Sequence, residues 1–141
     1  MSASKLRLYW RLQLAAHFLQ KQADRDLLKD ADITTAQFGV LSAISNGENV
    51  TQKDIANVLG LNQSAITAMV RRLMNLSYVE RQDSQTDGRS KTLTLTSDGQ
   101  NVIKNTRSPF RKINKRIESS LSEAEIANLA DYLERLTKTF R

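Results

Sequence analysis

The sequence predicts a mainly α-helical protein that carries one two-stranded β-ribbon. Apolar residues recur at three- and four-residue steps through most of the 141 residues, as they do on the buried faces of helices. The chain has only one proline and five glycines, which leaves room for long helices. Residues 78–82 and 91–96 differ, because they resemble two short strands on either side of a polar loop.

Two helices are expected in the first third of the chain. Residues 4–28 carry a regular stripe of leucines and alanines, which predicts one long amphipathic helix. A polar break follows. Thr34 then stands three residues before Gln37, and this capping-box pattern begins a second helix. Asn46 and Gly47 end it.

A pair of short helices joined by a tight turn is expected next. Thr51 and Asp54 form a second capping-box pattern, and Gly60 is a natural helix end. Asn62 or Gln63 opens the following helix. Its predicted buried face consists of Ile66, Met69, Val70 and Leu73.

Helices also fill the C-terminal part. A long helical stretch starts at Ser97, and Pro109 is expected to kink or break it near Arg107, because proline removes one backbone donor. Ser122 and Glu125 form a third capping-box pattern at the start of the last helix.

Composition favours a polyanionic partner and disfavours several other functions. The formal net charge is +6. Without cysteine the chain has no disulfide and no thiol nucleophile, and a single histidine, His17, cannot build a histidine-rich metal site. No apolar run reaches the roughly 18 residues of a membrane span, and no secretion signal is recognisable. We therefore expect a cytoplasmic protein that is not an enzyme, has no cofactor or metal and does not contact a membrane.

The outward face of the second short helix is suited to reading DNA. Gln63, Ser64, Thr67, Ala68 and Arg71 fall on it at helical spacing. In a major groove, amide side chains pair with adenine and arginine pairs with guanine, while backbone N–H groups at helix starts hold phosphates. An ordinary polar surface helix is the alternative, since helix-turn-helix patterns recur by chance.

The loop of the ribbon adds a second element with the same chemistry. Arg89, at a turn that Gly88 permits, is placed to enter a minor groove, where the negative potential attracts arginine. Asp87 would repel DNA, so we expect it to hold Arg89 or the loop backbone through a charge-assisted hydrogen bond.

These segments resemble the MarR family of bacterial transcriptional regulators. The resemblance rests on TQKDIANVLGLNQSAITAMVRRL, YVERQ and DGRSKTLTLTSDG, and it extends over nearly the whole chain. The last segment matches the family's wing motif at Asp87, Arg89, Leu95, Thr96 and Gly99. Two positions depart from the family pattern: Ser77 replaces a common glycine, which predicts a strained turn, and Gly88 replaces a common basic residue.

The resemblance implies a winged helix-turn-helix over residues 34–99, flanked by dimerisation helices over residues 1–33 and 100–141. It implies a homodimer, double-stranded DNA as partner, repression, and a pocket for a small organic effector, aromatic or phenolic. A module that binds protein, or DNA without regard to sequence, is the alternative.

The residues expected to contact DNA are Thr51, Gln52, Asn62, Gln63, Ser64, Thr67, Arg71, Arg72, Asp87, Arg89 and Lys91. The residues expected at the dimer interface are Tyr9, Leu12, Ile113, Ile117, Leu133, Leu136 and Phe140. Those expected to line the effector pocket are Trp10, His17 and Phe38.

Overall fold

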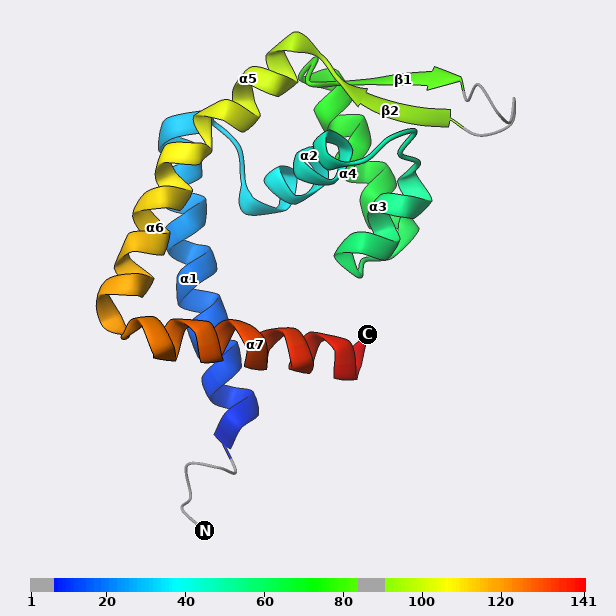
Figure 1. Ribbon diagram of the computed structural model, residues 1–141. Coiled ribbons are helices and arrows are strands. Elements are labelled where there is room, and N and C mark those ends of the chain that lie inside the picture. The colour runs from blue at the N-terminus through cyan, green and yellow to red at the C-terminus, as the bar shows by residue number, and fades with distance from the viewer. Residues whose placement is uncertain (1–6, 84–90) are drawn as a thin grey trace.

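A computed structural model describes residues 7–83 and 91–141 of the protein, as helices and one two-stranded antiparallel sheet (Figure 1). The elements are α1 (Leu8–Ala31), α2 (Thr35–Asn46), α3 (Gln52–Leu59), α4 (Gln63–Asn75), β1 (Val79–Asp83), β2 (Lys91–Leu95), α5 (Ser97–Asn105), α6 (Arg107–Ser120) and α7 (Glu123–Phe140). The predicted fold class, mainly α with a two-stranded wing, is confirmed.

All three predicted capping boxes are present. At the start of α2, the amide of Gln37 donates to Thr34 Oγ1 (3.1 Å), and the amide of Thr34 donates to Gln37 Oε1 (3.0 Å). The same reciprocal pair begins α3 and α7. Each box satisfies backbone donors that a helix start leaves without a partner, so these three starts follow from local sequence.

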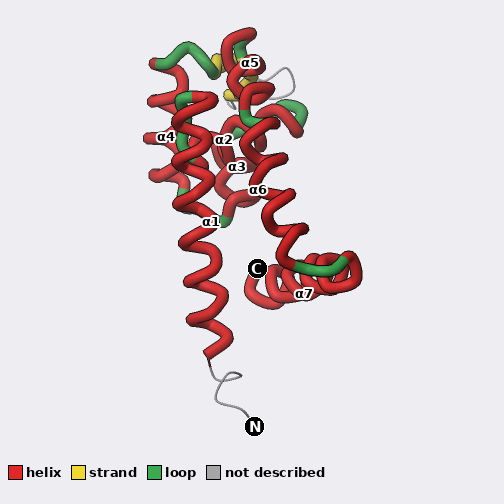
Figure 2. Tube along the Cα trace, turned by 90° about the vertical axis from the view of Figure 1, so that its left-hand side faces the viewer, coloured by secondary structure: helices red, strands yellow, loops and turns green. Residues whose placement is uncertain are grey.

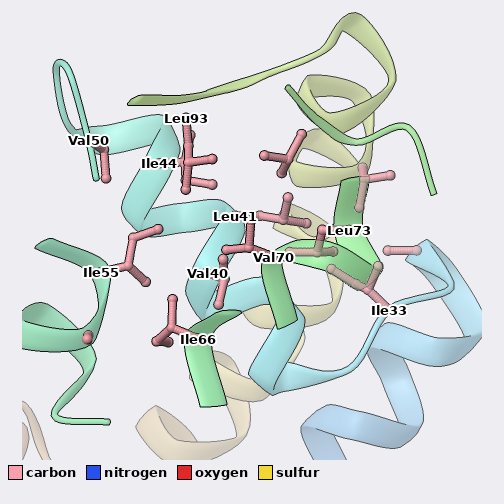
Figure 3. Packing of buried hydrophobic residues seen from close by; sticks show 14 of the residues in the cluster. Ile33, Val40, Leu41, Ile44, Val50, Ile55, Ile66, Val70, Leu73 and Leu93 are labelled. Atoms are coloured by element: carbon pink, nitrogen blue, oxygen red, sulfur yellow. The ribbon is translucent and has the colours of Figure 1, made fainter. Parts of the chain in front are cut away.

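The hydrophobic core lies where α2, α3, α4 and the sheet meet (Figure 3). Ile55, Ile66 and Leu73 are fully buried there. The segment before α3 is also attached to the sheet, because the amide of Leu93 donates to the carbonyl of Val50 (2.8 Å). This core fixes the position of α3 and α4 relative to the strands.

The first helix ends later than the sequence indicates. It continues to Ala31, which is 7% exposed and belongs to the core. Asp32 then takes a left-handed conformation (φ 55°) and reverses the chain toward α2. Asp24 Oδ1 accepts a hydrogen bond from the amide of Thr35 (2.7 Å), which ties α2 to α1. Tertiary packing thus extends the helix through residues of polar character.

The break near Pro109 is confirmed and lies at Thr106. The hydroxyl of this buried threonine donates to the carbonyl of Ile103 (2.6 Å) at the end of α5. Pro109 is the third residue of α6, where a backbone N–H has no partner within the helix. The long stretch is therefore two helices, α5 and α6.

The base of the wing is a compact junction built around Ser77 and Thr96. Ser77 has a φ of 63°, so the strain expected from a non-glycine residue in this turn is present. Thr96 Oγ1 donates to the carbonyl of Ser77 (2.6 Å) and accepts from the amide of Gly99 (3.0 Å). A Cβ on Gly99 would lie 2.2 Å from the carbonyl oxygen of Tyr78. The wing motif at Thr96 and Gly99 thus has a structural basis.

Two arms extend from the lobe formed by α2–α5 and the sheet (Figures 1 and 2). One arm is the N-terminal part of α1, and the other consists of α6 and α7. The N-terminal part of α1 and the lower part of α6 run away from this lobe, and α7 crosses below it. No residue of α7 is buried. Large apolar side chains are exposed on both arms, among them Tyr9 (73%) and Phe140 (85%). Within the described residues, no helix combines the length and apolarity needed to cross a membrane.

Candidate nucleic-acid interface

The turn between α3 and α4 is set by two residues. Gly60 adopts the left-handed conformation (φ 66°) that glycine accepts without a steric penalty, and it ends α3. Asn62 caps α4, since its Oδ1 accepts from the amide of Ala65 and from Ser64 Oγ, each at 2.8 Å. Asn62 and Ser64 therefore hold the start of α4 in place, and Gln63 is its first residue.

One face of α4 is anchored in the core and the opposite face is open. Ile66, Val70 and Leu73 are fully buried, and Met69 packs against the same core. The predicted inward face is thus confirmed. The exposed side chains of this helix include Gln63, Ser64, Ala68, Arg71 and Arg72. An anchored helix presents its polar face in a fixed orientation, as base reading requires.

Thr67 differs from its neighbours on the outward face. It is half-buried, and its hydroxyl lies 3.0 Å from Gln52 Oε1 and 2.9 Å from the carbonyl of Gln63. A hydroxyl has one proton, so these two acceptors share it. Thr67 joins α4 to the start of α3, and Gln52 is its partner in that contact.

A basic groove lies beside this joint. It has a volume of about 490 Å³ and is lined by Thr51, Gln52, Lys53, Thr67, Arg81, Lys91 and Leu93. Lys91 forms an ion pair with Asp83 on the neighbouring strand. The start of α3 also opens into the groove, and helix starts favour anions through their free N–H groups and the helix dipole. The arrangement can hold a phosphate.

Lys53 and Arg81 are the charged groove residues that sequence reasoning missed. Lys53 is the second residue of a capped helix, and this position indicates that it lies near a site for an anion. Arg81 lies on β1 opposite Leu93, and its position beside α3 depends on the fold. Two predicted residues, Asp87 and Arg89, lie outside the described residues.

The three residues expected to line an effector pocket are not gathered in one. Trp10 is 61% exposed. The ring of His17 packs edge-on against Phe18 (5.3 Å between centroids), and Phe38 packs against Phe110 (4.6 Å). A pocket of about 490 Å³ does lie between α1 and α6. Its lining is Ala15, Phe18, Leu19, Gln22, Ile113, Arg116, Ile117 and Ser120, none of which was predicted as a pocket residue.

The residues expected at a dimer interface fall into two groups. Tyr9, Leu12, Leu133, Leu136 and Phe140 are exposed on α1 and α7. Ile113 is only 9% exposed and Ile117 is half-buried, because both already pack within the chain at the α1–α6 contact.

The known proteins that this chain resembles include members of one family. A model of the MarR family matches residues 31–90. An uncharacterized HTH-type transcriptional regulator of Bacillus cereus is 34% identical over 82 residues, which cover 58% of this chain and 54% of that protein. The chain thus spans about half the length of this curated relative.

Two further relatives match over most of their length. The multiple antibiotic resistance protein MarR of Salmonella typhimurium is 27% identical over 124 residues, covering 85% of this chain and 86% of that protein. The crystal structure of a cysteine-to-serine mutant of MarR from E. coli, complexed with operator DNA, superimposes with a TM-score of 0.77 at 26% identity, covering 92% of this chain and 96% of that one. The anchored α4, the wing and these similarities together support a winged helix-turn-helix regulator of the MarR family.

Proposed function

We propose that the protein is a repressor that binds a pseudo-palindromic DNA operator as a homodimer. The observation that carries this proposal is the open polar face of α4, held by the buried side chains of Ile66, Val70 and Leu73, beside a groove with three cations. The MarR structure from E. coli that this chain resembles contains operator DNA, which supports the same partner here.

The residues of the interface take two roles in the proposal. Gln63 and Arg71 face base edges in the major groove and select the sequence. Arg72, Lys53, Arg81 and the first amides of α3 lie against phosphates and fix the position of the protein on the duplex. The cap of Asn62 on α4 and the hydrogen bond between Thr67 and Gln52 hold α4 and α3 together. The base-reading residues and the phosphate-binding residues therefore keep a fixed spacing.

Exposed apolar side chains on the two arms support the homodimer. The largest are Tyr9, Trp10, Phe18, Tyr132 and Phe140, each more than half exposed. Large apolar side chains that stay exposed together on an element usually mark an interface. Two copies joined through α1 and α7 would carry two α4 helices, which read half-sites about 34 Å apart when they face successive turns of the major groove.

The pocket between α1 and α6 supports binding of a small aromatic carboxylate. Phe18, Leu19 and Ile113 supply apolar walls, and Arg116 supplies a cation for the carboxylate. A ligand there would act between the dimerisation arms. It would release DNA only as far as it binds the DNA-incompetent arrangement more tightly.

Selection of bound duplexes from a random pool tests the function. We expect one recurring pseudo-palindrome, bound at least about 10³-fold more tightly than a scrambled duplex. Affinity should fall steeply as salt increases from 50 to about 200 mM, because phosphate contacts release counterions. Equal affinity for all duplexes would indicate an architectural protein, and no binding to any duplex would indicate a protein-binding module.

A further inference from the structure

A run of cations on α5 and α6 is not used by the proposed interface. Residues 104–116 contain six basic residues and no acidic one, which equals the formal net charge of the whole chain, +6. All six are exposed. Arg107, Arg111 and Lys115 recur at every fourth residue of α6, and Lys104 precedes them near the end of α5. We call these four residues the α6 stripe.

The three α6 residues of the stripe lie on the side of α6 that faces away from the rest of the molecule. Pro109 and Ile113 are the buried residues of this helix, and α6 packs on α1 through that side. At 100° per residue, Arg111 and Lys115 point in nearly the opposite direction from Ile113. In Figure 1, α6 forms the left edge of the molecule, whereas α3 and the strands are on the right. We therefore expect a duplex bound by α4 to leave the stripe uncovered.

The charges of the α6 stripe are not balanced by acidic side chains of the described residues. The ion pairs among those residues are Lys91–Asp83, Arg135–Asp131 and Lys138–Glu134. The acidic groups of α7 are mostly engaged within that helix. Asp131 and Glu134 are paired, and hydrogen bonds from the backbone and side chain of Ser122 hold the pKa of Glu125 below its ordinary value. The α7 helix of a second copy thus offers few free carboxylates to the stripe.

The chemistry of the α6 stripe fits a phosphate backbone. Arg107, Arg111 and Lys115 are separated by four residues, so they rise about 6 Å apart along the helix. A duplex carries one charge per roughly 1.7 Å of its axis, and it therefore offers phosphates at every step of such a row. No large apolar side chain of α6 is exposed, although a protein partner or a lipid surface would call for one.

We propose that the α6 stripe binds the phosphate backbone of a second DNA duplex, separate from the duplex contacted by α4. The binding is independent of sequence, because contacts to phosphates carry no information about the bases. The proposal depends on the proposed function only in calling this duplex the second one. Binding of DNA by the stripe does not require an operator on α4. A regulator with both surfaces would bridge two DNA segments.

The test compares two charge-matched variants on a random-sequence duplex. R107Q/R111Q/K115Q removes three cations of the stripe. K21Q/R25Q/K29Q removes three exposed cations at the same spacing on α1, where Asp24, Asp26 and Asp30 lie among them. We expect the first variant to lower the slope of log affinity against log salt by roughly 2–3, at about 0.9 per lost phosphate contact. The second variant should leave the slope unchanged. Equal effects of the two variants would overturn the proposal.

A crosslinking experiment locates the second duplex. The chain has no cysteine, so Asn114→Cys and Ala127→Cys each create a single attachment point for a photoactivatable crosslinker, on α6 and α7 respectively. With α4 saturated by its selected duplex, a labelled random duplex should crosslink from position 114 and not from position 127. Absence of that crosslink, or binding of the stripe to anionic lipid vesicles and not to DNA, would contradict the proposal. If no operator is found but the slope still falls, only the proposed function fails.

Discussion

Ser77 has a left-handed backbone conformation that is unfavourable for a residue with a Cβ. Its φ of 63° costs a residue with a Cβ about 1–2 kcal/mol, a penalty that glycine avoids. Glycine also gains more freedom in the unfolded chain, which offsets roughly half of this. We expect Ser77→Gly to raise the free energy of unfolding by about 0.5–1 kcal/mol in urea titrations. Ser77→Ala retains the Cβ and should change little; equal stability of the two variants would show that the turn is not strained.

Gly99 and Gly39 differ in how closely neighbouring atoms approach the position of a Cβ, so alanine variants at the two positions can be compared. A Cβ at Gly99 would meet the carbonyl oxygen of Tyr78 at 2.2 Å, whereas at Gly39 it would lie 3.6 Å from the Leu59 side chain, an ordinary contact. Gly99→Ala should lower the free energy of unfolding by about 1–3 kcal/mol. Gly39→Ala lies within α2 and should raise it by about 0.5–1 kcal/mol, since alanine favours helices. Calorimetry that finds the same sign for both would contradict the geometry of the wing base.

At the scale of elements, the contact between α3 and α4 depends on Thr67 and Gln52. Thr67→Val keeps the shape of the side chain and removes the hydrogen bond to Gln52 Oε1. The expected loss of stability is about 0.5–1.5 kcal/mol, with no change in preferred DNA sequence. Ser64→Ala is the control, because the amide of Ala65 still satisfies Asn62. An altered sequence preference for Thr67→Val would restore the base-contacting role predicted from the sequence.

Local sequence predicts the elements better than it predicts the joints between them. The pairs Thr34–Gln37 and Ser122–Glu125 satisfy each other's backbone groups within four residues, so these helix starts can be recognised in the sequence. Thr67 and Gln52 are 15 residues apart, and their contact depends on the angle between two helices. The α1–α6 pocket joins segments from opposite ends of the sequence, which no local pattern reveals.

At the scale of the whole molecule, the two arms account for the exposed apolar surface. α7 buries no residue within the chain, and Leu133 and Leu136 remain 43% and 40% exposed. If a second copy covers them, Leu136→Glu should shift the protein from dimer to monomer in analytical ultracentrifugation at micromolar concentration. Leu61→Glu changes a similarly exposed apolar residue (45%) in the turn between α3 and α4 and should leave the dimer intact. A dimer that survives Leu136→Glu unchanged would place the interface elsewhere.

The central claim is that the outward face of α4 reads DNA sequence, and the preferences of two adjacent arginine variants test it most directly. Arg71 lies on that face and Arg72 one position further around the helix, both exposed. Arg71→Ala should cost about 1–3 kcal/mol and relax preference at one base pair of each half-site, measured by sequencing duplexes selected from a random pool. Arg72→Ala should weaken binding to all duplexes alike. Identical preferences for the wild type and Arg71→Ala would contradict base reading by this residue.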